Sequence, residues 1–252
     1  MDVTLSDRLQ KLPPYLFADL RRKMAAAREK GVKVIRIDIG DPDSPAPDPI
    51  VQEMIRAIDD KNDPVRHRYG CDVPAAEYPE AIKNFYQRRW GVSLAEEQIV
   101  TTMGSKDAIA KLPLAIMNPG DLGIAPQPGY PTYNIGHVFA GGSTYYVPLR
   151  KENGFLMDFE EIPADVRKAA KILWINYPNN PTTATATKEF FEAVVEFGRQ
   201  NHILIAHDSA YSENTYDGYQ SPSILQVDGA EEVAVEFFRD RKSTRLNSSH
   251  YS

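Results

Sequence analysis

Cysteine, excess positive charge and long apolar runs are all scarce in this sequence. Cys71 is the only cysteine among 252 residues, which excludes an internal disulfide and a zinc site built from cysteines. Lys and Arg number 29 against 35 Asp and Glu, for a formal net charge of −6. The chain as a whole therefore offers no general attraction to a phosphate backbone, and we expect no nucleic-acid partner.

Membrane and repeat architectures are also disfavoured. The apolar runs, such as 172–175, are too short to cross a bilayer. The opening residues, MDVTLSDRLQ, lack the basic and apolar regions of a signal peptide. We therefore expect a cytoplasmic protein with no membrane partner. No segment of roughly 20 to 50 residues repeats along the chain, which argues against a solenoid or a propeller.

The first part of the chain shows mostly helical patterns. Apolar residues recur at helical spacing in three segments, and alternating isoleucines between the first two predict a strand. The predicted helices lie near 15–30, 50–58 and 78–90, and the predicted strand at 32–39.

From residue 98 onward, short apolar runs alternate with helical patterns, which is typical of a parallel sheet covered on both faces. We predict strands at 98–102, 122–125, 144–148, 171–177, 202–206 and 232–238. We predict helices at 107–117, 133–139 and 187–200. The fold class is therefore α/β, a three-layer αβα sandwich with a mostly parallel sheet. Ligands of such sheets bind at the carboxyl ends of the strands.

Two of these strand ends carry groups that suit an anion and a planar ring. Ser105 and Lys106 follow Gly104 where a strand turns into a helix, and the amides and dipole of a helix start attract phosphate. A serine cap beside an exposed lysine is the alternative. Tyr130 and Tyr133 flank a proline near another strand end, where a tyrosine ring either stacks on a flat cofactor or packs a turn.

The next two strand ends supply an amide, an acid and a phenol. Asn179 and Asn180 leave a side-chain amide at the tip of 171–177, although Asn-Pro clusters also form plain turns. Asp208 directly follows a buried apolar run, which is costly unless the carboxylate meets a cation or several donors. Tyr211 follows three residues later. A helix cap and an aromatic in the packing are the alternatives for these two residues.

Taken together, these groups match the needs of pyridoxal 5′-phosphate. The cofactor is an electron sink while its ring nitrogen is protonated, and an adjacent carboxylate stabilises that charged form. The segments GSKDAI, PGYPTY, NYPNNPT and HDSAYSENTYDGY, in this order, resemble the large domain of the class I/II, fold type I aminotransferases. Residues 13–20, 37–51, 117–133 and 140–156 resemble the LL-diaminopimelate aminotransferase subgroup.

The resemblance implies a set of site residues. It places Ser105 and Lys106 at the cofactor phosphate, Tyr130 on the ring face, Asn180 and Tyr211 at the ring oxygen O3′, and Asp208 at the pyridine nitrogen. It implies that Tyr69 reaches the phosphate of a partner subunit, so that the intact protein is a homodimer. It also places Tyr15 and Gly40 on the substrate side and requires no metal.

The sequence departs from the family pattern at three places. Thr183 stands where the family usually has glycine, and Pro74 and Pro79 replace the usual glycine and arginine. The family strand matching 232–238 leads to a lysine that forms a Schiff base with the cofactor. Here Lys242 falls at about that distance, but two arginines replace the expected serines. A solvated tail lysine is the better interpretation, so we assign no catalytic residue.

The resemblance implies three parts of the chain and one main function. The parts are an N-terminal segment at 1–45, which is an arm or part of a small domain, a partial cofactor-binding large domain at 46–238, and a disordered non-family tail at 239–252. The function is transfer of an amino group between an amino acid and a 2-oxo acid. Another fold type I reaction, such as a C–S lyase, and an inactive cofactor-binding or dimerising fragment are the alternatives.

Overall fold

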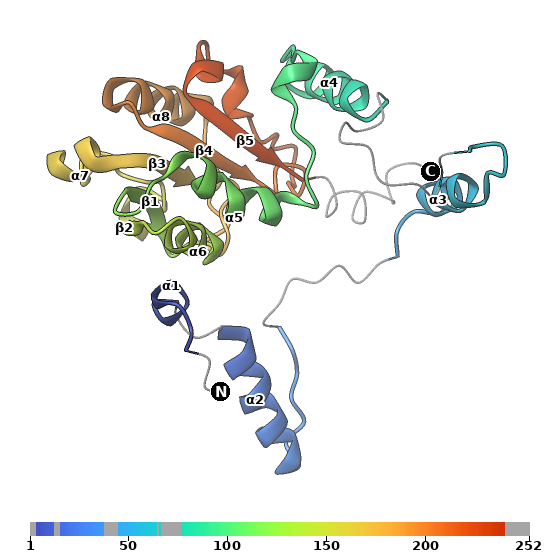
Figure 1. Cartoon of the computed structure of the whole chain (residues 1–252), viewed down its shortest axis with the longest axis horizontal. Helices are drawn as coiled ribbons and strands as arrows, with labels where there is room; N and C mark the ends of the chain where they lie inside the picture. Colours follow the sequence, from blue (N-terminus) through green and yellow to red (C-terminus); the bar gives the residue numbers. More distant parts are fainter. Residues whose placement is uncertain (1–3, 13–15, 38–44, 65, 67–76, 240–252) are drawn as a thin grey trace. The chain divides into compact units, whose positions relative to one another are not determined.

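The computed structural model describes residues 4–12, 16–37, 45–64, 66 and 77–239 (Figure 1). The chain divides into two compact units, residues 1–45 and 46–252. The first unit contains helices α1 (Asp7–Gln10) and α2 (Leu16–Glu29), and α2 confirms the first predicted helix. Residues 32–37 form no strand, contrary to the prediction. Ile35 and Ile37 are 80% and 95% exposed, and no partner strand pairs with them within the described part of the chain.

The second unit is built around a five-stranded sheet in the order β2-β1-β3-β4-β5. All four neighbouring pairs are parallel, which confirms the predicted α/β class. The strands are β1 (Leu122–Gln127), β2 (Ser143–Pro148), β3 (Ala170–Ile175), β4 (Leu204–Ser209) and β5 (Ala234–Phe238). The helices are α3 (Asp48–Asp59), α4 (Glu77–Trp90), α5 (Ser105–Ile116), α6 (Thr132–Phe139), α7 (Ala164–Ala169) and α8 (Lys188–Asn201). Short 3-10 turns are η1 (Glu96–Gln98), η2 (Lys151–Asn153), η3 (Ile224–Gln226) and η4 (Ala230–Glu232).

Helices cover both faces of the sheet (Figure 1). Successive side chains of a strand point to opposite faces, and β3 shows the result. Ile172 and Trp174 pack in one apolar cluster with α5 and α6, whereas Leu173 and Ile175 pack in a second cluster with α8. From Ile172 to Ile175 both faces of β3 are fully buried. The sheet is therefore the middle of three layers, as predicted.

Several predicted strands need correction. β3 ends at Ile175 and not at residue 177, and β5 begins at Ala234 and not at residue 232. Residues 99–102 form no strand and follow the 3-10 turn η1. Val100 is 83% exposed, because β5 is the last strand on its side of the sheet as the described residues show it. β4 begins at Leu204 and not at residue 202, because α8 continues to Asn201 and His202 ends that helix in the left-handed region at φ 55°.

A buried carboxylate connects α4 to the sheet. Glu236 of β5 accepts hydrogen bonds from the Tyr86 hydroxyl of α4 at 2.8 Å and from the Ser223 hydroxyl at 2.9 Å. His207 Nδ1 of β4 lies 2.9 Å from the same carboxylate. The indole of Trp90 donates to the Ser221 carbonyl at 2.8 Å. These bonds hold α4 against β5 although the two elements are about 150 residues apart.

A neutral histidine is buried between α6 and the face of the sheet that α5 and α6 cover. His137 of α6 is fully buried. Its Nε2 accepts from the Trp174 indole at 3.0 Å, and its Nδ1 lies 2.7 Å from Thr144 Oγ1, which donates onward to Asn134. These partners require the tautomer protonated at Nδ1. Burial lowers the pKa of His137 to about 4, because the low dielectric disfavours the charged ring.

The space for this ring exists only because residue 123 is glycine. A Cβ at Gly123 would lie 2.2 Å from His137 Cε1 and 2.3 Å from Nε2. We expect Gly123→Ala to lower the free energy of unfolding by at least about 2 kcal/mol, since overpacking a closed core is destabilising. Denaturant unfolding measures this. The double variant Gly123→Ala/His137→Ala should be less destabilised than the sum of the two single changes, and strict additivity would contradict the clash.

The depressed pKa of His137 also predicts acid sensitivity. In the unfolded chain a histidine takes up a proton near its ordinary pKa of about 6.5, whereas the folded ring stays neutral down to about 4. The stabilisation is therefore complete above pH ~6.5 and is lost as the pH falls toward 4, by up to about 3 kcal/mol. His137→Gln keeps an acceptor for Trp174 but does not titrate. Melting curves from pH 7 to 4 should show a smaller loss for this variant, and an equal loss would contradict the assignment.

Candidate active site

Asp208 is the most unusual polar residue at the carboxyl edge of the sheet. It lies near the end of β4 and is 5% exposed. Its Oδ2 accepts a hydrogen bond from the Tyr133 hydroxyl at 2.8 Å, whereas its buried Oδ1 has no hydrogen-bond partner among the described residues. Burial raises the pKa of Asp208, and the bond from Tyr133, the charges of His207 and Arg239 and the nearby amide of Ala210 act in the opposite direction.

The free oxygen of Asp208 tests whether these residues suit pyridoxal 5′-phosphate. A buried carboxylate oxygen without a donor is costly. The protonated pyridine nitrogen of the cofactor is both a donor and a cation, so it supplies what Oδ1 lacks. The residues present therefore fit the cofactor at this position.

Tyr133 holds the carboxylate in one orientation. Its ring stacks on Trp174 with centroids 4.8 Å apart and an interplanar angle of 11°. Burial, together with the negative charge of Asp208, raises the pKa of the Tyr133 hydroxyl well above its ordinary value, so the group remains a donor. Tyr130, predicted to cover the ring face, is half-buried and meets Tyr133 edge to face at 5.8 Å.

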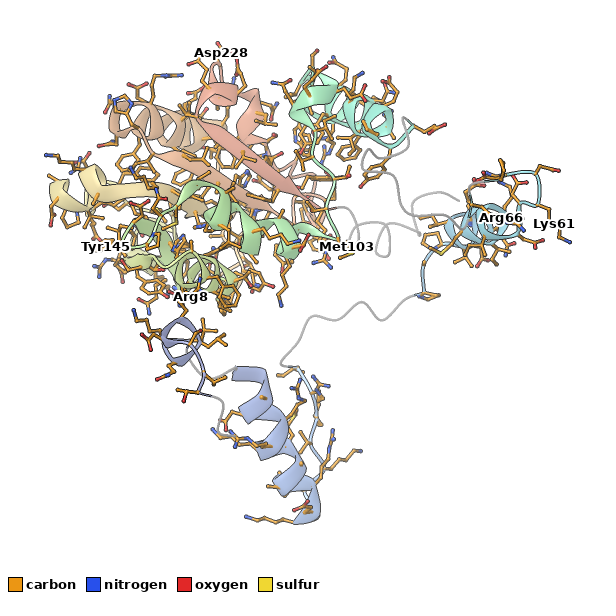
Figure 2. The ribbon with its side chains drawn as sticks, viewed as in Figure 1. Arg8, Lys61, Arg66, Met103, Tyr145 and Asp228 are labelled. Atoms are coloured by element: carbon orange, nitrogen blue, oxygen red, sulfur yellow. The ribbon has the colours of Figure 1, made fainter. Side chains whose placement is uncertain are left out.

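The predicted phosphate side lies at the start of α5. Gly104 precedes the helix at φ 79°, and Ser105 is the first helical residue and is buried. Lys106 is exposed. Met103, just before them, is 90% exposed (Figure 2). The arrangement provides free amides, a hydroxyl and a positive charge at a helix N-terminus, which is a suitable environment for a phosphate.

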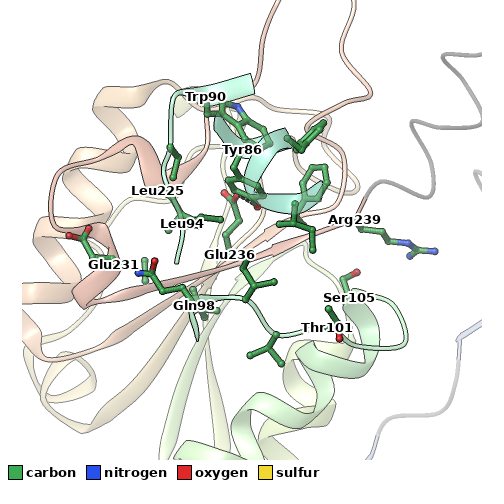
Figure 3. A pocket seen from close by; sticks show the side chains of 18 of the residues that line it. Tyr86, Trp90, Leu94, Gln98, Thr101, Ser105, Leu225, Glu231, Glu236 and Arg239 are labelled. Carbon is green, nitrogen blue, oxygen red and sulfur yellow. Dashed lines mark hydrogen bonds between the residues drawn. The ribbon is translucent and has the colours of Figure 1, made fainter. Parts of the chain in front are cut away.

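A cavity of about 1490 Å³ adjoins this helix start. It is bounded by α4, residues 91–106 and β5 (Figure 3). Figure 3 shows Ser105 and Arg239 on one side of the cavity and Glu231 on the other. Asp208, Asn180 and Tyr130 are not among its lining residues. The cavity therefore includes the predicted phosphate side, whereas the predicted ring contacts lie outside it.

The turn after β3 presents Asn180 at the strand tip. Asn180 is exposed, and its backbone N–H donates to Asn176 Oδ1 at 2.8 Å. Thr183 adopts the left-handed region at φ 62°, which is strained for a β-branched residue and explains why a glycine is expected there. The turn nevertheless closes, because Thr183 N–H donates to the Asn179 carbonyl at 2.8 Å. The threonine thus leaves Asn180 in place.

The other predicted residues are placed in part. Tyr211 is half-buried in the turn after β4, and its carbonyl accepts from Asn214 N–H at 2.9 Å. Tyr15, Gly40, Tyr69 and Lys242 lie outside the described residues, as does Pro74. Pro79 lies buried in the first turn of α4. The individual roles of all the predicted site residues stay predictions.

Sequence reasoning missed two features of this edge. It named Tyr133 as an aromatic but not as the donor to Asp208, because the bond joins residues 75 positions apart. It also passed over Asn176, whose side chain bonds to the backbone of both Asn180 and Asp208. The only available signal was an amide just before the turn residues. The described residues contain no cluster of His, Cys, Asp and Glu able to hold a metal and no helix long and apolar enough to span a membrane.

Comparison with known sequences gives a consistent result. A family model described as aminotransferase class I and II matches residues 32–236. The LL-diaminopimelate aminotransferase of Moorella thermoacetica is 47% identical over 231 residues, which are 91% of this chain and 58% of that protein. The enzyme of the same name from Aquifex aeolicus is 50% identical over 234 residues, or 92% of this chain and 59% of that protein. The chain thus spans less than two thirds of these relatives.

Solved structures agree on the fold. Substrate-bound BacF from Bacillus subtilis has a TM-score of 0.88 at 32% identity, covering 99% of this chain and 62% of that one. A probable N-succinyldiaminopimelate aminotransferase from Thermus thermophilus has a TM-score of 0.83 at 32% identity, covering 92% of this chain and 63% of that one. The resemblance found in the sequence is confirmed, and with it pyridoxal 5′-phosphate as the cofactor of the family. The chain belongs to the class I and II aminotransferases.

Proposed function

We propose that this chain is the cofactor-binding part of a pyridoxal-phosphate-dependent aminotransferase. The whole protein would move an amino group between an amino acid and a 2-oxo acid as a homodimer in the cytoplasm. Identities of 47% and 50% to two LL-diaminopimelate aminotransferases support LL-diaminopimelate as the amino donor, and hence a role in lysine biosynthesis. The names of these relatives give no support to the C–S lyase alternative.

One observation carries the proposal. Asp208 is a buried carboxylate with one oxygen bonded to Tyr133 and the other without a hydrogen-bond partner in the described part of the chain. It lies at the strand edge where ligands of parallel sheets bind. A protein that only needed a stable fold would gain by replacing such a group with an apolar residue. The unpartnered oxygen is therefore explained by a ligand that donates a hydrogen bond to it.

The residues at the carboxyl edge of the sheet would contact different parts of the cofactor. When bound, the cofactor supplies an electron sink for the carbon next to the amino group. Asp208 would hold the proton on the pyridine nitrogen, while Asn180 and Tyr211 would hydrogen-bond O3′. Ser105 and Lys106, with the first amides of α5, would bind the phosphate.

The remaining roles complete the site. Tyr130 would cover the ring face and exclude water, and Tyr69 would reach the phosphate of the partner subunit. Tyr15 and Gly40 would lie on the substrate side. We assign the base that moves the substrate proton to no described residue, and 1–45 and 239–252 remain the predicted N-terminal segment and tail.

The test is the response of Asp208→Asn to pyridoxal 5′-phosphate. We expect the variant to bind the cofactor about 10- to 100-fold more weakly, because it loses a charge-assisted hydrogen bond. Quenching of the two tryptophans during a cofactor titration measures this. Without cofactor, the variant should be at least as stable as the parent chain, since it removes a buried charge.

Asp165→Asn is the matched control, because Asp165 is exposed, lies in α7 directly before the amino end of β3, and does not line the cavity beside α5. It should change neither affinity nor stability. Equal cofactor affinity of Asp208→Asn and the parent chain would refute the role of Asp208. Absence of cofactor binding by the parent chain would refute the proposal for these residues and would favour the inactive dimerising fragment.

A further inference from the structure

The pairing of β3 with β4 ends just before the predicted cofactor contacts. The last paired residues are Ile175 and His207. Beyond them the two chains are joined by side chains. Asn176, which is 2% exposed, donates from Nδ2 to the Asp208 carbonyl at 2.7 Å, and its Oδ1 accepts from Asn180 N–H at 2.8 Å. One buried amide thus bonds to the backbone of both residues.

We propose that Asn176 is a positioning residue that fixes Asn180 relative to Asp208. The inference rests on the proposed function, in which these two residues contact O3′ and the pyridine nitrogen of one rigid ring. The distance between those two ring atoms is fixed, so the spacing of the protein groups must be fixed as well. Asn176 contacts the backbone of both residues with one side chain.

Only a planar amide of this length meets the requirement. We call the two hydrogen bonds from Asn176 to the Asp208 carbonyl and the Asn180 N–H the clamp. The clamp needs a donor toward a carbonyl and an acceptor toward an N–H, both from one side chain. Aspartate keeps the acceptor but has no proton for the Asp208 carbonyl, and alanine keeps neither. Asn176→Asp therefore removes one of the two hydrogen bonds, and Asn176→Ala removes both.

A second connection holds the strand ends together when the clamp is removed. His207 Nε2 lies 3.0 Å from the Tyr177 carbonyl, and Nδ1 lies 2.9 Å from the Glu236 carboxylate. Glu236 also accepts from the hydroxyls of Tyr86 and Ser223. Both ring nitrogens of His207 thus have a partner, and the ring is buried. This bond to Tyr177 remains in variants of Asn176, so their effect should be local.

The first measurement needs no cofactor. Hydrogen exchange of the assigned Asn180 amide, followed by NMR, reports whether its bond to Asn176 exists. We expect protection in the parent chain and in Asn176→Asp, and loss of protection in Asn176→Ala. Equal protection in all three proteins would overturn the clamp. The parallel strand amides of β3 and β4 serve as the internal reference for folding of each variant.

The second measurement is the affinity and absorption spectrum of bound pyridoxal 5′-phosphate. We expect both Asn176→Asp and Asn176→Ala to weaken binding about tenfold, the usual effect of losing one well-placed buried hydrogen bond. Both should also shift the visible absorption of the bound cofactor, because the contacts to O3′ and the ring nitrogen change together. A residue that only stabilised the fold would lower the melting temperature without shifting this spectrum.

Asn179→Asp is the matched control for a new carboxylate in the same turn. Asn179 is 4% exposed and donates to the Asn176 carbonyl at 3.2 Å, while its Oδ1 accepts from Thr182. The aspartate keeps the acceptor, so cofactor affinity should change less than about threefold. If Asn176→Asp behaves like this control, the positioning role is wrong. If the parent chain binds no cofactor, the proposed function fails, while the exchange of the Asn180 amide still decides whether the clamp exists.

Discussion

The hydrogen bond from Tyr133 to Asp208 is the constraint on which the candidate site depends. It fixes one carboxylate oxygen, while no described residue hydrogen-bonds to the other. The bond forms because the Tyr133 ring lies flat on Trp174, whose indole in turn donates to a neutral His137. That histidine fits only because Gly123 has no side chain. The orientation of the Asp208 carboxylate at the sheet edge is thus set by the packing of Trp174, His137 and Gly123 inside the sheet. None of these three residues is part of the candidate site.

Strands were predictable from sequence where both faces are buried by helices. The apolar runs that became β1, β3 and β4 are bounded by turns and have neighbours on both sides. Residues 98–102 and 32–37 have similar side chains, yet neither segment is a strand. An alternating or apolar pattern reports how side chains would be buried, whereas a strand also needs a neighbour with free backbone groups. The sequence contains no local signal for that neighbour, and so these two predictions were wrong.

The sequence predicts those site residues whose type is unusual for their position in a strand or turn. Asp208 after an apolar run and Asn180 at a strand tip were found because their types are costly or uncommon there. The partners of these residues were not found, because Tyr133 and Asn176 reach Asp208 across 75 and 32 residues of sequence. Such contacts follow from the sheet order and register, which residue patterns alone do not supply. The glycine expected at Thr183 could be explained only by its positive φ.

Two adjacent polar residues at the end of β4, His207 and Asp208, are both buried but differ in how fully they are hydrogen-bonded. His207 and Asp208 are neighbours in sequence, so the pleat directs them to opposite faces of the sheet. On the α8 side, the ring centroids of His207 and Phe191 are 4.8 Å apart, and both nitrogens of His207 have hydrogen-bond partners. On the α6 side, Oδ2 of Asp208 accepts from Tyr133, and Oδ1 has no hydrogen-bond partner among the described residues. The buried contacts of His207 with Glu236 and Tyr177 anchor the strand, and this rigidity allows Asp208 to keep one oxygen without a partner among the described residues. Two adjacent residues of β4 therefore have different roles: His207 stabilises the strand on one face, and Asp208 offers a ligand acceptor on the other.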